Sequence, residues 1–208
     1  MNKNQSCTDC GQINCKYQDK MYPKFCKTKD LTKKDIDDIK KLYQNPENYE
    51  VARVSAEVEA EFYGNYTRVE EIIEFARRLN FKKIGIASCV GLINESRIFA
   101  KILRKNDFEA YTALCKIGSM KKVETLDLSK NVEITGEIMC NPIVQAKILN
   151  NEDTELNVVI GLCVGHDSLF YKYSEALTTT LITKDRVLAH NPAGALYQTK
   201  SYYKKLLK

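Results

Sequence analysis

Eight cysteines are the residues of this sequence with the widest chemical repertoire, and only two histidines accompany them. The first four follow the spacing Cys-x2-Cys-x4-Cys-x10-Cys, in polar sequence with almost no aliphatic residues. Two thiolates separated by two residues can bind one tetrahedral metal ion, and later cysteines complete its coordination. Because metal binding can supply the folding free energy of a segment without a core, we predict a four-cysteine metal knuckle that holds zinc in preference to an iron–sulfur cluster. Its ligands are Cys7, Cys10, Cys15 and Cys26, with two disulfides or unligated thiols as the alternatives.

The other four cysteines each lie where a short apolar run gives way to a turn or a helix start. Cys89 follows KIGIAS, Cys115 follows EAYTAL, Cys163 follows NVVIGL, and Cys140 directly precedes Asn-Pro. The carboxyl ends of parallel strands lie along one edge of a sheet, where ligands bind, so these residues can converge from distant positions. The set suits a 4Fe–4S cluster, a second zinc ion, or a pair of thiols for redox exchange. The alternative is that each is a small buried hydrophobic residue.

Cys89, Cys163 and His166 are our candidates for a catalytic role. A helix N-terminus beside a cysteine favours the thiolate, which is the better ligand and nucleophile. His166 follows Cys163 in the sequence Cys-Val-Gly-His-Asp, so it can ligate a metal, exchange protons beside a thiolate, or cap the next helix. The charged triplet at 184–186 is interpreted as a solvated turn, with substrate or anion binding as the alternative.

The elements that must position these residues follow an α/β pattern. Apolar residues recur at helical spacing over 31–44, 47–63 and 67–79, and Thr67 with Glu70 has the signature of a capping box. From Lys82 onward, short apolar runs alternate with helical periods, which is typical of βαβ units. The strand candidates are KIGIAS, EAYTALC, LNVVIGLC and TTTLIT, followed by a shorter run, RVLAH.

This pattern predicts a mostly parallel, Rossmann-like three-layer α/β sheet, with a helical N-terminal lead-in and the small four-cysteine metal knuckle. Residues 1–28 form the knuckle, 29–81 a helical segment that packs on the core, and 82–208 the α/β domain with its cysteine-lined site. Helices are expected over 92–105 and after Pro142, which suits a first helical position. Residues 119–138 are compatible with either one more strand or a long loop.

Composition limits the classes of protein that this chain can belong to. A length of 208 residues with 44% hydrophobic content suits one main folded domain with an appendage. Lys+Arg 32 against Asp+Glu 27 gives +5, which is mild and interspersed, so a nucleic-acid partner is not expected. The sequence opens without a secretory signal and holds no apolar stretch of the ~18–20 residues that a membrane span needs. We therefore expect a cytoplasmic protein with reduced thiols and no membrane association.

Several long stretches carry a resemblance to a known family: CTDCGQINC, TRVEEIIEFARRLNFKKIGIASCVGL, CNPIVQAKILN and LNVVIGLCVGHDSLFYKYSEALTTTLITKDRVLAHNPAGALY. Through them the chain resembles the uncharacterised metal-binding proteins of anaerobic bacteria and archaea grouped as domain of unknown function 1847. The resemblance runs over nearly the whole chain. It implies a cytosolic metal-binding protein without naming a reaction, and it marks as motif positions Cys89, Cys115, Cys140, Cys163 and His166.

The leading hypothesis is an iron–sulfur or thiol-dependent redox protein of anaerobic metabolism. In it, zinc occupies the N-terminal knuckle, while the second set of cysteines holds the cluster or supplies thiolates. His166 orients or protonates a bound species, and the partner is an unidentified small molecule or redox protein. The alternative is a non-catalytic metal or ligand sensor in which only structural zinc is bound.

Overall fold

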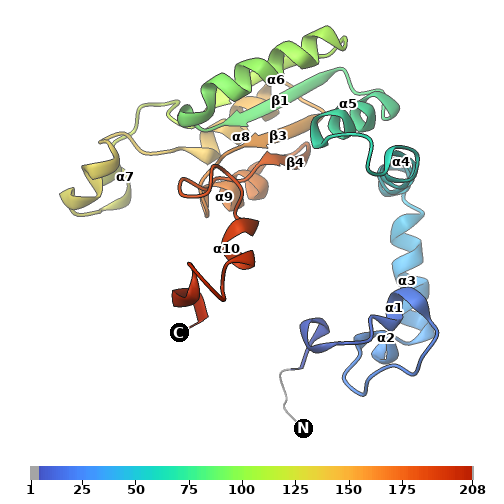
Figure 1. Ribbon diagram of the computed structural model, residues 1–208. Helices are drawn as coiled ribbons and strands as arrows, with labels where there is room; N and C mark the ends of the chain where they lie inside the picture. Colours follow the sequence, from blue (N-terminus) through green and yellow to red (C-terminus); the bar gives the residue numbers. More distant parts are fainter. Residues whose placement is uncertain (1–4, 208) are drawn as a thin grey trace. The chain divides into compact units, whose positions relative to one another are not determined.

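The computed structural model describes residues 5–207 of the chain (Figure 1). The chain divides into two compact units between Glu57 and Val58, and helix α4 (Pro46–Phe62) runs across this division. Among the described residues, none of the helices combines the length and the apolar character that crossing a membrane requires.

The first unit consists of short helical turns followed by longer helices: η1 (Cys7–Asp9), α1 (Asn14–Tyr17), α2 (Lys27–Asp30), α3 (Lys33–Tyr43) and the first part of α4. Thr32 begins α3 with a capping box, because its backbone N–H donates to the Asp35 carboxylate at 2.8 Å and its hydroxyl accepts from the Asp35 N–H at 3.2 Å. Within residues 5–50, Asn14 is the one buried residue. This stretch therefore has no hydrophobic core of its own.

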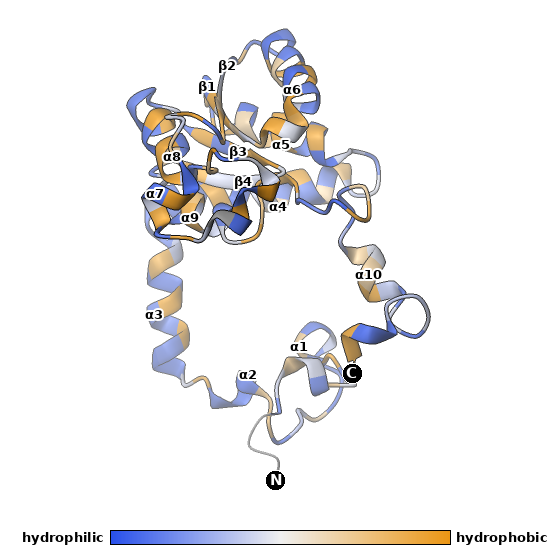
Figure 2. Ribbon diagram, turned by 90° about the vertical axis from the view of Figure 1, so that its left-hand side faces the viewer, coloured by the Kyte–Doolittle hydropathy of each residue, from blue (hydrophilic) through white to orange (hydrophobic). Residues whose placement is uncertain are grey.

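The second unit holds the remaining elements: α5 (Arg68–Arg78), β1 (Lys83–Ser88), η2 (Val90–Leu92), α6 (Ile93–Lys105), β2 (Glu109–Leu114), α7 (Lys122–Leu126), η3 (Lys130–Thr135), α8 (Pro142–Asn151), β3 (Leu156–Ile160), α9 (His166–Tyr173), β4 (Leu177–Ile182), α10 (Ala193–Tyr197) and η4 (Lys204–Leu207). As Figure 2 shows, β1 and β3 are largely hydrophobic, whereas α2 in the first unit is hydrophilic.

The four strands form one parallel sheet in the order β2-β1-β3-β4. Ile84 of β1 is in register with Ala110 of β2 and with Leu156 of β3. From β1 the chain moves to β2 on one side and then crosses to β3 on the other side, so the strand order reverses between β1 and β3. In open parallel sheets, a ligand binds beyond the carboxyl ends of the strands at such a reversal.

Helices cover both faces of this sheet and make it the middle of three layers. On one face, β1 and β3 pack against α5 and α6 in a core cluster of Ile72, Ile73, Ala76, Ile84, Ile86, Leu92, Phe99, Ala100, Leu103, Phe108, Leu156, Val158 and Ile160. On the other face, the strands pack against α8 and α9 in a cluster of Ala87, Cys89, Ala113, Cys115, Ala146, Leu149, Val159, Leu162 and Phe170. The predicted Rossmann-like α/β fold is confirmed.

The local sequence signals agree closely with the structure, with one exception. The capping box at Thr67 is present, since its N–H donates to the Glu70 carboxylate at 2.7 Å, and Pro142 is the first residue of α8. The run RVLAH was expected to resemble a strand, and this expectation is wrong. It forms a turn instead, because Ala189 and His190 have positive φ angles of 49° and 64°, which no strand allows.

Candidate functional site

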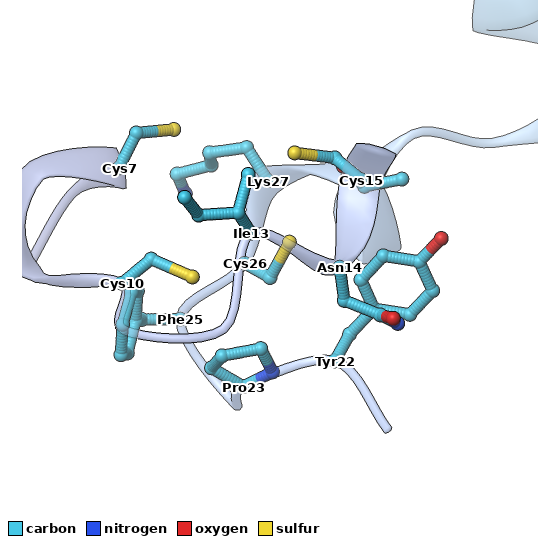
Figure 3. A pocket seen from close by; sticks show the side chains of 11 residues that line it. Cys7, Cys10, Ile13, Asn14, Cys15, Tyr22, Pro23, Phe25, Cys26 and Lys27 are labelled. Carbon is cyan, nitrogen blue, oxygen red and sulfur yellow. The ribbon is translucent and has the colours of Figure 1, made fainter. Parts of the chain in front are cut away.

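Four N-terminal cysteines line one cavity of about 150 Å³ in the first unit. Figure 3 shows the sulfur atoms of all four pointing into this cavity. Cys7 belongs to η1, Cys15 to α1, and Cys26 immediately precedes α2, so three separate helical turns and the loop at Cys10 contribute one thiol each. A cavity lined by four thiols has the donor set of a structural zinc site.

Polar interactions shape the wall of this cavity. The buried side chain of Asn14 accepts hydrogen bonds from the backbone N–H groups of Asp19 and Lys20 at 2.9 and 3.0 Å, which fixes the loop after α1. The hydroxyl and backbone N–H of Thr28 donate to the Cys26 sulfur and hold the pKa of this thiol below its ordinary value. Cys26 therefore sits in surroundings that favour the thiolate, the form that binds metals.

The sheet ladder places two cysteines of the second set side by side at its carboxyl edge. The Cys89 N–H donates to the carbonyl of Ile160 at 3.0 Å, and the Cys115 N–H donates to the carbonyl of Ser88 at 2.9 Å. Each cysteine thus continues its strand by one residue, at the ends of β1 and β2. The backbone N–H of Val90 also donates to the Cys115 sulfur at 3.3 Å, so this thiol lies over the turn that follows β1.

Two further backbone contacts bring in the other cysteines. The N–H of Asn141 donates to the carbonyl of Cys115 at 2.7 Å, which returns the chain to the sheet edge and places Cys140 beside Cys115. At the end of β3, the N–H of His166 donates to the carbonyl of Cys163 at 2.9 Å and starts α9. Side chains from three strand ends and one helix start therefore gather at one edge of the sheet.

Cys115 is the central thiol of this group. It is hydrogen-bonded to the sulfurs of Cys140 and Cys89, and together with burial these contacts raise the pKa of Cys115. The hydrogen bond from Cys115, aided by the backbone N–H of Gly91 and by Lys184, lowers the pKa of Cys89 to about 5. One retained proton thus stabilises a thiolate on a neighbouring sulfur.

Cys140 has a second partner in His166. Hydrogen bonds from Cys115 and from His166 lower the pKa of Cys140 to about 3, and the Cys140 thiolate raises the pKa of His166 in return. The imidazolium and the thiolate form an ion pair at the start of α9. His166, which the sequence made a candidate for orienting or protonating a bound species, therefore contacts one of the candidate thiols directly.

Cations from the end of β4 face the remaining thiols. The guanidinium of Arg186 donates to the Cys163 sulfur at 2.9 Å, and this contact raises the pKa of Arg186. Lys184 donates to the Cys89 sulfur. Three of the four thiols thus have a cationic neighbour. The fourth, Cys115, keeps its proton and lies between Cys89 and Cys140.

A buried amide supports the site from behind. Gln145 of α8 is fully buried, and its Nε2 donates to the carbonyls of Ser88 and Ala113 at 3.1 and 2.7 Å. Ser88 is the last residue of β1, directly before Cys89, and Ala113 is the second-last residue of β2, two positions before Cys115. Its Oε1 has no hydrogen-bond partner within the described part of the chain. Gln145 therefore ties α8 to the two strand ends that carry the central thiols.

The thiols are free, and no metal geometry is preformed. All eight cysteines are unpaired by disulfides. Between residues 5 and 207, no group of three or more His, Cys, Asp or Glu side chains is arranged closely enough to hold a metal ion as it stands. Metal coordination at either set would require the thiols to rotate toward a common centre.

The sequence identified every thiol of both sets, and their roles remain predictions. It did not select Lys184 and Arg186, because a charged triplet after a strand is usually a solvated turn. Gln145 was missed as well, although a signal existed: it is a polar residue on the face of α8 that carries Ala146 and Leu149 into the core.

Comparisons with known proteins identify relatives of this chain. It is 51% identical over 201 residues to an uncharacterised protein of Methanocaldococcus jannaschii, and the match covers 97% of each chain. A solved structure of Dph2 from Pyrococcus horikoshii with a 4Fe–4S cluster is similar with a TM-score of 0.34 and 19% identity, over 68% of this chain and 33% of that one. This chain thus spans about a third of the length of that protein. The sequence model described as "Protein of unknown function (DUF1847)" matches residues 26–181, and the chain belongs to this family.

Proposed function

We propose that this protein binds metal through two cysteine sites in the cytoplasm, and that the site at the sheet edge performs redox chemistry. Zinc at Cys7, Cys10, Cys15 and Cys26 has a structural role. What supports it is the combination of four thiols lining one cavity with a segment whose one buried residue between 5 and 50 is Asn14. Structural zinc contributes about 10–16 kcal/mol in small peptides, enough to order such a segment.

The redox centre is carried by Cys89, Cys115, Cys140 and Cys163. The observation that carries the proposal is the meeting of these thiols at the strand-order reversal, each beside a cation or a neighbouring thiol. A 4Fe–4S cluster or a second zinc ion takes such thiolate ligands, and nearby cations offset their negative charge. When bound, a cluster would supply one-electron redox chemistry, while these residues hold it and exclude water from the buried side.

Metal analysis of three proteins tests this proposal. The wild-type chain is purified under anaerobic conditions beside the double variants Cys89→Ser/Cys163→Ser and Cys10→Ser/Cys26→Ser, and iron, sulfide, zinc and visible absorption are measured. We expect the first variant to lose iron, sulfide and colour but keep zinc. The second should lose zinc and keep the cluster, so that each variant controls for the other.

Other outcomes contradict parts of the proposal. A colourless wild-type protein with zinc alone, and with the same metal content in Cys89→Ser/Cys163→Ser, rules out the cluster and favours a metal or ligand sensor with structural zinc. A zinc content in Cys10→Ser/Cys26→Ser that is equal to that of the wild type rules out the N-terminal site.

One observation favours a second candidate, metal-free thiol–disulfide exchange: Cys115 is hydrogen-bonded to two thiols of lowered pKa. The Cys140 thiolate attacks a substrate disulfide and releases one substrate thiolate. Cys115 then gives up its proton to this thiolate, and its sulfur attacks Cys140, which releases the second substrate thiolate. The substrate disulfide is reduced to one thiol and one thiolate, and a Cys115–Cys140 disulfide forms.

Oxidised glutathione distinguishes this candidate from metal binding. We expect the wild-type chain to lose two hydrogens on the peptides that contain Cys115 and Cys140, and Cys115→Ser to retain one glutathione on Cys140. A wild-type chain that forms no disulfide within the sheet-edge group at any glutathione ratio refutes the exchange mechanism.

A further inference from the structure

The loop that follows β4 is built to present two cations. Asp185 stands between Lys184 and Arg186, but its carboxylate accepts hydrogen bonds from the backbone N–H groups of Val187 and Leu188 at 2.9 and 2.8 Å. The backbone N–H of Asp185 donates to His190 Nδ1 at 3.1 Å, and the His190 N–H donates to the Asp185 carbonyl at 2.9 Å. The acidic residue and the histidine thus fix the turn.

Lys184 reaches from β4 across β3 to the end of β1. A Cβ atom placed on Gly161 would lie 3.6 Å from Lys184 Cε, so the lysine stem passes over this glycine after β3. A Cβ atom placed on Gly91 would lie 3.8 Å from Lys184 Nζ and 3.8 Å from Cys89 Sγ. The ammonium group therefore ends beside Cys89, at the point where the strand order reverses.

Neither cation has a carboxylate partner between residues 5 and 207. Two acids of this region are engaged elsewhere: Asp185 in its own turn, and Asp167 with the backbone N–H of Ser168 at 2.8 Å. Access from solvent is open, since Val164, next to Cys163, is 94% exposed. Lys184 donates to the Cys89 sulfur and Arg186 to the Cys163 sulfur, but both cations have further N–H donors, and these can attract an anion from solution.

We propose that Lys184 and Arg186 form a binding subsite for the carboxylate group of a small organic acid, which holds the rest of that molecule against Cys163 and Cys89. The proposal extends the proposed function, since it names the class of substrate for the sheet-edge site. An arginine fork and a lysine ammonium together match the geometry and charge of a carboxylate.

The test uses two alkylating reagents that react at the same carbon but differ in the charge of the group attached to it. Iodoacetate transfers a carboxymethyl group and iodoacetamide a carbamidomethyl group to a thiolate, and both release iodide, but only iodoacetate carries a carboxylate. Their rate ratio at Cys163 therefore reports attraction of a carboxylate, because any change in the thiolate itself affects both reagents. The full-length chain is reduced, freed of metal by a chelator under anaerobic conditions, and analysed peptide by peptide with mass spectrometry.

We expect the ratio of iodoacetate to iodoacetamide at Cys163 to fall about tenfold in Lys184→Gln/Arg186→Gln, a modest steering effect for two charges. The matched control is Lys101→Gln/Lys105→Gln, which removes the same charge from exposed positions on α6 and should leave the ratio unchanged. Cys7 in the first unit gives an internal reference in every sample. Circular dichroism verifies that both variants fold.

A ratio at Cys163 that is no higher than at Cys7, or that is the same in both double variants, overturns the subsite. Metal content, measured in the same preparations before chelation, separates this result from the proposed function. A protein that binds no metal through its second cysteine set but shows the tenfold change keeps the subsite and loses the metal centre. A protein that binds metal through its second cysteine set but shows an unchanged iodoacetate-to-iodoacetamide ratio keeps the metal centre and loses the subsite.

Discussion

Substitution of Gly161 should reveal how tightly the sheet edge is packed. Gly161 follows β3 with a φ angle of +66°, and its N–H donates to the carbonyl of Ile182 at 2.7 Å. A Cβ atom at this position would lie only 1.9 Å from Cδ1 of Leu92, which is 2% exposed in the core. Gly161→Ala must therefore displace a buried leucine as well as adopt an unfavourable backbone conformation.

The two costs can be estimated separately. A left-handed backbone costs a non-glycine residue about 1–2 kcal/mol. Inserting a methyl group into a packed core costs about 1–3 kcal/mol. Gly161→Ala should therefore lower the free energy of unfolding by about 2–5 kcal/mol. Gly165 offers a matched control, because its φ is +83° and a Cβ atom there meets nothing within 4 Å. Gly165→Ala should cost only the backbone part, about 1–3 kcal/mol, because its ψ of −34° places it in a sparsely populated region.

Urea unfolding followed by far-UV circular dichroism measures both variants against the wild type. We expect a lower midpoint at an unchanged slope, with the larger shift in Gly161→Ala. Equal losses in the two alanine variants would refute the reasoning, because they would mean that Leu92 does not pack against Gly161. The path of Lys184 over this glycine would then lose its support as well.

Three further predictions concern the buried side chains of Asn14 and Gln145 and the ion pair between Cys140 and His166. Asn14→Ala should lower the stability of the first unit by about 1–3 kcal/mol, because the backbone N–H groups of Asp19 and Lys20 lose their acceptor. It should also weaken zinc binding, as measured by competition with a chelator, whereas Gln18→Ala, at an exposed position, should do neither. Gln145→Leu should cost about 1–3 kcal/mol in urea unfolding, because the Ala113 carbonyl loses its amide donor. In the metal-free protein, the raised pKa of His166 contributes stability that is complete below about pH 6.5 and is lost as pH rises through that raised value. The lowered pKa of Cys140 contributes stability that is complete above about pH 8.5 and is lost as pH falls toward about 3. The stability difference between the wild type and Cys140→Ser should therefore shrink as pH falls from about 6.5 toward about 3, where the His166 contribution no longer changes; a difference independent of pH would contradict the ion pair.

Local signals in the sequence were sufficient to predict the four strands and the helices α3, α4, α5, α6 and α8. The capping box at Thr67 depends on residues only three positions apart, and each strand is a short run rich in apolar or β-branched residues. The strand order could not be predicted in this way, because it depends on pairings such as Ile84 with Leu156, which are distant in sequence. Residues 119–138 contain α7, η3 and one antiparallel bridge between Lys121 and Ile138, too short and too exposed to show periodicity.

The candidate site shows the same division between local and distant information. Cysteines at strand ends were recognisable because a parallel sheet brings all carboxyl ends to one edge. The cations were not, since the choice between a solvated turn and a site depends on where the Asp185 carboxylate points. In the structure it turns back to Val187 and Leu188, and this leaves its neighbours to face the thiols.

The two sets of cysteines differ in what would position them without a metal. Around the N-terminal set, the buried residue between 5 and 50 is a polar asparagine, so we expect metal binding itself to hold these thiols together. At the sheet edge, backbone hydrogen bonds from Cys89 to Ile160 and from Cys115 to Ser88 belong to a sheet that is buried on both faces. These thiols would keep their places when a metal or a substrate leaves. The backbone that carries the second set is thus fixed by the sheet, whereas the first set depends on its metal, and this difference is the physical reason for which we propose a structural role for the first set and the chemistry for the second.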